Sequence, residues 1–96
     1  MNVRRGIEAE RKCKQELEAR GYHVSRSAAS KGEYDIIAVG RKDILLIQVK
    51  RTGNPYRKFA KADILKLKNA KAPISEIVKK QFWCWIDKIG WEIKEL

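Results

Sequence analysis

The sequence has few of the residues that hold small proteins together covalently or through metals. Its 96 residues include two cysteines and one histidine, with no CxxC pair. A structural zinc site usually needs four Cys or His ligands, so this scarcity argues against such a site. Cys13 and Cys84 allow one disulfide at most, but two isolated cysteines are more often buried thiols. His23 has no partner in the pattern, and we expect it at the surface.

Long hydrophobic runs are also missing. The apolar stretches 36–39, 44–47 and 82–86 are far shorter than the roughly 20 residues that span a bilayer. The start of the chain, MNVRRGIEAERK, is charged where a secretory signal would have an apolar core. We therefore expect a soluble, cytoplasmic protein with no membrane partner.

Acidic residues are in the minority. Twelve Asp and Glu face 22 Lys and Arg, which gives a net charge of +10. Such a balance on a short chain predicts a polyanionic partner, with nucleic acid first and an acidic membrane surface second. Nucleic acid is favoured because no basic amphipathic helix with exposed aromatic residues is evident.

The length and patterning predict a single domain, 1–96, of α/β class. The hydrophobic fraction of 44% argues against disorder. Apolar spacing predicts a helix over about 3–20, ended by Gly21, and a second helix over about 59–67. The expected strands are 22–27, 33–39, 43–51, 81–87 and 91–96, with residues 74–80 left between a helical turn and a loop. Helices between strands favour a mixed sheet flanked by helices, and near-continuous apolar runs favour central strands covered on both faces.

The stretch 44–51, ILLIQVKR, raises the question of function. Its aliphatic run ends in Gln48 and Lys50, which share one face of a strand, and an unpaired buried Lys is costly. If residues 40–43 form the turn before it, Asp35 lies directly opposite Gln48 in an antiparallel pair, and Lys50 lies diagonally. A one-residue slip would destroy this arrangement.

A fourth polar residue comes from the first helix. On a helical wheel, Glu10 lies near the middle of the apolar stripe of Val3, Ile7, Cys13 and Leu17, whereas Glu8 points to the opposite side. Buried Glu is usually paired. Either Glu10 meets a cation such as Arg26 or Lys50, or the helix is rotated and Glu10 lies at the edge of the stripe.

Two carboxylates, an amide oxygen and an ammonium suit a divalent cation. Mg²⁺ prefers hard oxygen ligands, usually one or two carboxylates with waters and phosphate oxygens. Glu10, Asp35 and Gln48 would hold Mg²⁺ or Mn²⁺, and Lys50 would position the attacking water or stabilise charge on a phosphate. The alternative is a structural Asp–Lys pair. The charge of +10 favours the catalytic interpretation.

This pattern resembles the PD-(D/E)XK nuclease superfamily, in which D and (E/Q)-x-K follow a helix that carries Glu. More narrowly, four ordered segments look like the archaeal Holliday-junction resolvases: RGIEAER, GYHVSRSAASK, YDIIA and IQVK. The match extends to a closing GWEI. The resemblance covers nearly the whole chain. It implies a restriction-endonuclease-like αβββαβ core, an archaeal or viral intracellular setting, and a homodimer that cuts symmetric strands of a junction.

The resemblance also assigns residues. Glu10, Asp35, Gln48 and Lys50 fall on catalytic positions, with Lys50 on the catalytic lysine. Arg11, Arg26, Ser30 and Lys31 fall on positions that hold DNA phosphates near the active site. With the basic residues beside these motifs, the DNA-binding set that we expect is Arg4, Arg5, Arg11, Arg26, Ser30, Lys31 and Arg51.

One departure from the family pattern matters. Gln48 stands where the family usually has Glu, so metal binding should weaken. Tyr34 stands in place of the usual proline, but that position varies and carries little weight. Q-x-K forms also occur in the Mrr-type restriction nucleases. The interpretation is therefore a metal-dependent, structure-specific DNA endonuclease; the alternatives are an Mrr-like nuclease on duplex DNA and a DNA-binding protein of the same fold that does not cut.

Two further groups of residues have alternative interpretations. Basic residues of the second helix form either a solvated face or a surface that follows DNA phosphates. The three tryptophans fall in strand patterns, which favours a role in the core or a dimer interface over base stacking.

Overall fold

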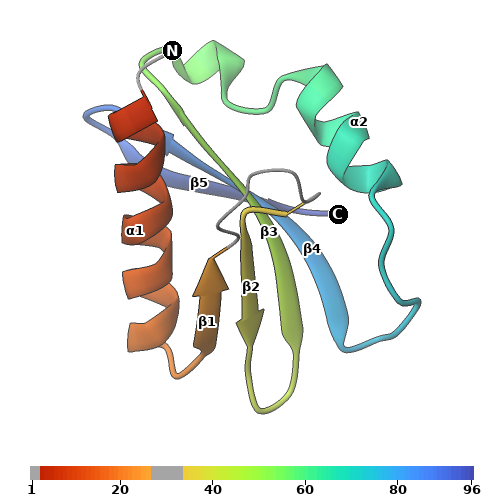
Figure 1. The fold of residues 1–96 in the computed structure, drawn as a ribbon. Helices are drawn as coiled ribbons and strands as arrows, with labels where there is room; N and C mark the ends of the chain where they lie inside the picture. Colours follow the sequence, from red (N-terminus) through yellow and green to blue (C-terminus); the bar gives the residue numbers. More distant parts are fainter. Residues whose placement is uncertain (1–2, 27–33) are drawn as a thin grey trace.

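The computed structural model describes residues 3–26 and 34–96, which form two helices, a short 3-10 helix and five strands (Figure 1). Their order is that predicted from the sequence: helix, three strands, helix, two strands. The elements are α1 (Val3–Ala19), β1 (His23–Arg26), β2 (Ile36–Val39), β3 (Ile44–Thr52), the 3-10 helix η1 (Pro55–Arg57), α2 (Lys61–Asn69), β4 (Val78–Ile86) and β5 (Gly90–Glu95).

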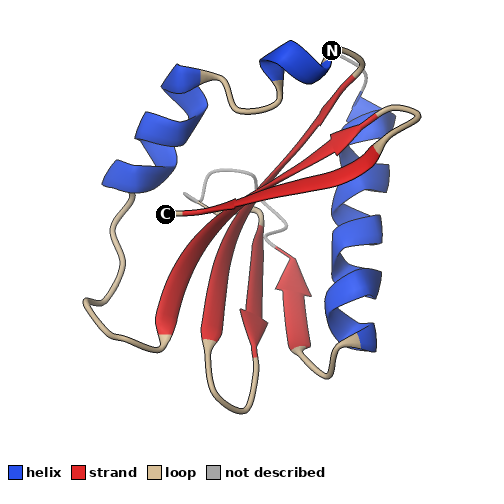
Figure 2. Ribbon diagram, turned by 180° about the vertical axis from the view of Figure 1, so that it is seen from behind, coloured by secondary structure: helices blue, strands red, loops and turns tan. Residues whose placement is uncertain are grey.

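The five strands form one mixed sheet in the order β1-β2-β3-β4-β5. Neighbouring strands are antiparallel except β3 and β4, which run parallel and are joined through α2 (Figure 2). The predicted hairpin register is confirmed, because Val39 pairs with Ile44 and Ile36 with Ile47. The predicted α/β class with a mixed sheet is therefore confirmed.

Each helix covers a different part of the sheet. Cys13 and Leu17 of α1 pack on one face against Ile36, Ile47 and Trp83. On the other face, α2 packs over the β4 end, where its one buried residue, Leu67, joins a cluster with Phe82, Cys84 and Ile86. Asp35, just before β2, and Gln48 and Lys50 of β3 line a pocket together with residues of both helices.

Among the side chains of α1 that the structure describes, residues 6–19, the buried stripe is Ala9, Cys13 and Leu17 and does not include the predicted Ile7. Ile7 is exposed because the helix is rotated toward Ala9, and this rotation moves Glu10 from the middle of the stripe to its edge. Glu8 and Glu10 thus flank Ala9, one on each side of the helix face that meets the sheet. The helix ends as predicted, with Gly21 at φ 93°, a conformation that favours glycine.

The turn between β2 and β3 is fixed by a tyrosine from outside the hairpin. The amide of Gly40 donates to the carbonyl of Asp43, and the Tyr22 hydroxyl donates to the Asp43 carboxylate at 2.7 Å. A Cβ at position 40 would lie 2.6 Å from the Tyr22 ring, so only glycine leaves room for this ring. The Tyr22 contact holds the turn that sets the β2–β3 register.

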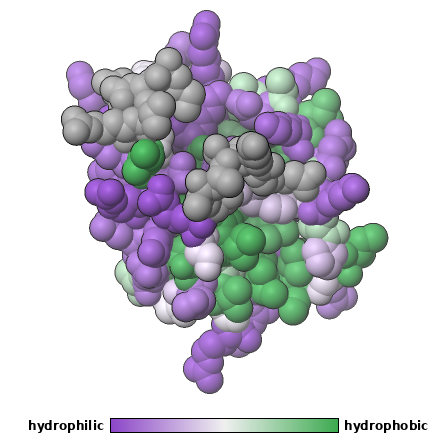
Figure 3. Space-filling model, in the orientation of Figure 1, coloured by the Kyte–Doolittle hydropathy of each residue, from purple (hydrophilic) through white to green (hydrophobic). Residues whose placement is uncertain are grey.

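Three expectations about strands and helices were wrong in detail. The face of β2 opposite α1 is not covered: Ile37 and Val39 are 43% and 46% exposed, because α2 lies over β4 (Figure 3). Strand β4 begins at Val78, three residues before the predicted start, after a turn with no helix. The second helix begins at Lys61 and not at about 59, because residues 58 and 59 form a turn after η1.

The remaining core expectations hold. Trp83 is buried, and it meets Trp91 edge to face, with ring centres 5.3 Å apart. Cys13 and Cys84 are free buried thiols, which belong to the clusters on opposite faces of the sheet. His23 is exposed, as expected. Within the described ranges, no helix is long and apolar enough to cross a membrane.

Candidate active site

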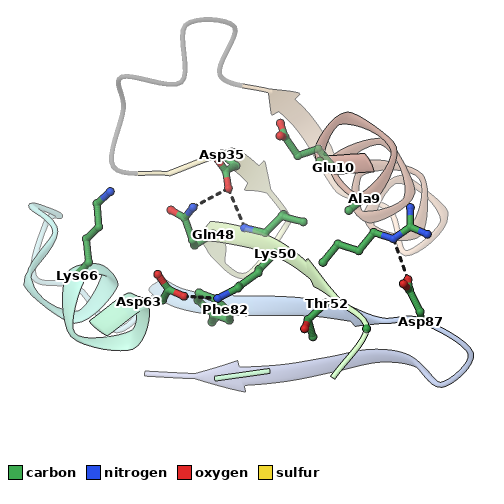
Figure 4. A pocket seen from close by; sticks show the side chains of 14 residues that line it. Ala9, Glu10, Asp35, Gln48, Lys50, Thr52, Asp63, Lys66, Phe82 and Asp87 are labelled. Carbon is green, nitrogen blue, oxygen red and sulfur yellow. Dashed lines mark hydrogen bonds and ion pairs between the residues drawn. The ribbon is translucent and has the colours of Figure 1, made fainter. Parts of the chain in front are cut away.

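A pocket of about 630 Å³ opens between α1 and α2, with β3 as its floor (Figure 4). Gly6 and Ala9 of α1 line one side, and because Gly6 has no side chain and Ala9 has a single methyl group, they leave space above the strand. All four residues that the sequence marked as catalytic, Glu10, Asp35, Gln48 and Lys50, line this pocket.

Asp35 and Gln48 meet as the hairpin register requires. Gln48 Nε2 donates to Asp35 Oδ2 at 2.8 Å, and the backbone amide of Val49 donates to the same oxygen at 2.9 Å. These two donors fix the carboxylate just before β2 begins. Because Gln48 uses its amide nitrogen on Asp35, its carbonyl oxygen is directed away from that carboxylate.

Burial raises the pKa values of Asp35 and Glu10, and the negative charge of Asp35 adds to the rise at Glu10. Burial raises the pKa of Asp35, and the Val49 hydrogen bond and the charge of Lys66 partly oppose this rise. Burial, followed by the negative charge of Asp35, raises the pKa of Glu10, while Arg26 lowers it. The Arg26 guanidinium lies 3.6 Å from Glu10 Oε1, which is one of the ion pairs considered from the sequence. A cation near both carboxylates would relieve their repulsion.

Lys50 extends toward α2 instead of Asp35. Its ammonium lies 2.6 Å from Oδ2 of Asp63, so the structural Asp35–Lys50 pair is replaced by an Asp63–Lys50 pair. Sequence reasoning missed Asp63. The available signal was that it is the one carboxylate in the basic helix KADILKLKN. Lys66, one turn later on α2, also lines the pocket.

At the other end of the pocket, Arg51 is held by two acids. Its Nε donates to Asp87 at 2.8 Å and its Nη1 to Glu8 at 3.3 Å. This network ties α1 to β3 and to the turn after β4. The charge of Arg51 is thereby largely compensated within the chain.

The other expected DNA-binding residues lie on the α1 side or outside the described part. Arg4 and Arg5 belong to the first turn of α1, and Arg11 is exposed on the same helix. Arg26 ends β1 beside Glu10. Ser30 and Lys31 lie outside the described residues.

The donor set fits a small hard cation of the magnesium kind. Over residues 3–26 and 34–96 the structure contains no group of three His, Cys, Asp or Glu side chains that could hold a metal ion. Four carboxylates line the pocket, but Asp63 and Asp87 are held by Lys50 and Arg51. Asp35 and Glu10, with the amide oxygen of Gln48, are the remaining donor set. Mg²⁺ commonly takes one or two carboxylates and fills its other positions with water and phosphate oxygens, so these residues suit it better than a fully protein-bound metal.

The order of elements, the mixed sheet and the Asp35–Gln48–Lys50 edge define a protein with the restriction-endonuclease-like fold. More particularly, the model of the archaeal Holliday junction resolvase (Hjc) family matches residues 1–73. This match covers most of the chain, and the chain belongs to that family.

A solved structure is also similar. Hjc of Archaeoglobus fulgidus, a Holliday junction resolvase from an archaeal hyperthermophile, aligns with a TM-score of 0.64 and 18% sequence identity. The alignment covers 93% of this chain and 70% of that chain. At this identity the likeness shows the shared fold. Comparison with curated proteins gave no match.

Proposed function

We propose that this chain is a divalent-metal-dependent endonuclease that cuts four-way DNA junctions. The observation that carries the proposal is the contact between Asp35 and Gln48 on the floor of a pocket that also contains Lys50, in a chain of the resolvase family. A DNA substrate supports the proposal that the protein acts in the cytoplasm, in an archaeal or viral intracellular setting.

Three residues are proposed to hold Mg²⁺ or Mn²⁺: Asp35, Glu10 and Gln48. When bound, such an ion acidifies water and polarises the phosphodiester. Gln48 keeps Asp35 in place through its amide nitrogen and presents its carbonyl oxygen to the pocket. Lys50 carries a positive charge at the pocket, where it positions the attacking water or stabilises the charge that builds on the phosphate.

The proposed DNA contacts are electrostatic. A net charge of +10 attracts the phosphate backbone whatever its sequence. The α1 residues Arg4, Arg5 and Arg11, with Arg26, Ser30, Lys31 and Arg51, are the proposed phosphate-binding set. Arg26 and Arg51 are paired with acids in the structure, so phosphate contact by either would require an exchange of partners.

We propose a homodimer as the acting form. Each chain carries one Asp35–Gln48–Lys50 set, whereas a junction has two symmetric strands to cut. The uncovered face of β2, with Ile37 and Val39, gives an uncharged surface where two chains of charge +10 can meet (Figure 3). Sedimentation equilibrium tests this: Val39→Lys should convert the dimer into a monomer, and a monomeric unsubstituted protein would overturn it.

Gln48 favours a second candidate, a DNA-binding protein of the same fold that does not cut. An amide brings no negative charge, so it binds a divalent cation more weakly than Glu does. Gain of cleavage in Gln48→Glu would identify the amide as the cause of inactivity. An Mrr-like nuclease on duplex DNA differs from the first proposal in substrate alone.

A cleavage assay separates these candidates. The purified protein is incubated with Mn²⁺ or Mg²⁺ and a panel of four-way junction, flap, plain duplex and methylated duplex, beside the Lys50→Ala variant. Junction cleavage that the variant lacks supports the resolvase proposal, and preferential cutting of methylated duplex supports the Mrr-like one. Salt-sensitive binding with no cutting of any substrate supports the binding protein and overturns the first proposal.

A further inference from the structure

Lys50 is anchored by a residue outside the strand motif. The carboxylate of Asp63, in the first turn of α2, accepts a hydrogen bond from the Lys50 ammonium at 2.6 Å, across 13 residues of sequence. The two side chains are 39% and 35% exposed, so the pair lies at the mouth of the pocket and not in the core. Figure 4 shows Lys50 extending from β3 toward α2 to meet Asp63.

Position and chemistry both suit Asp63 to an anchoring role. A lysine side chain has a flexible four-carbon stem and about 2 kcal/mol of rotamer entropy, so an unpaired ammonium at the pocket would sample many positions. Aspartate has one methylene and little freedom of its own. A negative charge in the first turn of a helix is also stabilised by the helix dipole.

Asp35 and Asp63 therefore accept hydrogen bonds from different parts of the pocket. Asp35 accepts from Gln48 and Val49, while Asp63 accepts from Lys50. If Lys50 paired with Asp35 instead, its ammonium would occupy the oxygen that the proposed cation needs. The contact with α2 keeps the lysine in the pocket and leaves Asp35 for that cation.

We propose that Asp63 is the positioning residue for Lys50, so that α2 completes an active site whose chemistry is borne by β2 and β3. This inference rests on the proposed function of Lys50. Its rivals are a purely structural tie between α2 and β3, and an inhibitory clamp that withholds the lysine from the phosphate.

The first test compares two isosteric substitutions that remove one negative charge each. Asp63→Asn removes the anchor charge, and Glu16→Gln removes the acid of an ion pair with Arg20 on the distal part of α1, at 3.0 Å. Single-turnover junction cleavage and junction Kd are measured for both, with thermal unfolding as the control for folding. Asp63→Ala and Asp63→Glu extend the series.

Asp63→Asn should lower the cleavage rate by about 10- to 100-fold, because a small displacement of a reacting group has effects of this size. Its junction Kd should stay equal or become tighter, since a negative charge near the DNA is lost. Glu16→Gln should leave the rate unchanged, and Asp63→Glu should restore part of it. Equal rates for both isosteric variants overturn the proposal, and a faster rate for Asp63→Asn shows the clamp instead.

A second measurement does not depend on cleavage. The ¹⁵N–¹H signal of the Lys50 ammonium, assigned by its loss in Lys50→Ala, reports the hydrogen bond to Asp63 directly. It should be sharp in the unsubstituted protein and in Glu16→Gln, and broadened by water exchange in Asp63→Asn. A signal unchanged by Asp63→Asn overturns the inference. If no substrate is cut, the first proposal fails while this signal still decides whether Asp63 holds Lys50.

Discussion

The α1 side of the pocket and the α2 side carry their charges differently. On the α1 side two arginines have acidic partners: Glu10 lies beside Arg26, and Glu8 and Asp87 lie beside Arg51. On the α2 side Asp63 is engaged by Lys50, and Lys66 lines the pocket with an exposed side chain. An arginine that is paired with an acid of the same chain has less charge available for a DNA phosphate. The α1 side therefore offers less positive charge than its number of arginines suggests, and the α2 side offers more by comparison.

The largest effect on cleavage is expected from Lys50 on β3, the strand between the α1 side and the α2 side. Lys50→Ala should lower metal-dependent junction cleavage by about 10²–10³-fold, the usual loss when one stabilising charge is removed from an active site. DNA affinity should change little. Lys79→Ala is the control, because Lys79 is another strand lysine paired with an acid, 3.7 Å from Asp43. Equal cleavage by the two variants would remove Lys50 from the mechanism.

Gln48→Glu should alter stability in a metal-dependent way. Without metal, the variant loses the hydrogen bond to Asp35 and places two carboxylates side by side, so its free energy of unfolding should fall by about 1–3 kcal/mol. Mg²⁺ should restore the loss and raise the Tm more than in the unsubstituted protein.

Gln81→Glu is the matched control for that experiment. Gln81 also donates its amide nitrogen to a carboxylate, Glu95, at 2.8 Å, but on the β4–β5 pair away from the pocket. Its Tm should respond to Mg²⁺ no more than that of the unsubstituted protein. Identical Mg²⁺ responses in both variants would argue against a cation at Asp35 and Gln48.

Lys66→Ala tests the α2 side alone. If Lys66 contacts one phosphate, the slope of log Kd against log salt should change by about 0.9 for duplex arms, with weaker binding for all sequences. Lys42→Ala, in the β2–β3 turn at the other end of the hairpin, should leave the slope unchanged. A reversed result would place the DNA over the turn and away from the pocket.

The smallest effect is expected on the α1 side. Glu8→Gln removes one of the two partners of Arg51, and the Glu8 side chain is half exposed. Its pair should contribute less than about 1 kcal/mol, so urea unfolding should hardly change. Low-salt DNA binding should become slightly tighter, as Arg51 is partly released. A fall of more than about 2 kcal/mol in the free energy of unfolding would show that the main role of the Glu8–Arg51–Asp87 network is to stabilise the fold.

Sequence reasoning found the strand-borne part of the site because strand geometry is strict. A turn at 40–43 and a period of two predict Asp35 opposite Gln48, and the observed pairing confirms it. The rotation of α1 could not be derived with the same certainty. Ala9 is small enough to meet the sheet closely, yet a hydrophobicity pattern gives more weight to Ile7.

Asp63 was missed for a different reason. Its role depends on where α2 lies over β4, which is a long-range packing result set by Leu67 and Phe82. No local sequence pattern predicts how close Asp63 lies to Lys50. The exposed face of β2 was missed for the same reason. An apolar strand pattern predicts that Ile37 and Val39 are buried, and only the position of α2 shows that they are exposed.

Helix α2 spans nine residues and buries one of them, Leu67, and Lys80 of β4 donates to carbonyls at its C-terminal end. A segment attached at so few points can exchange its outer side chains at little cost to folding, while the strands below keep the reactive groups in place. Substrate preference in such a scaffold can therefore be re-engineered on α2 alone, with libraries at its solvent-facing positions and an unchanged sheet.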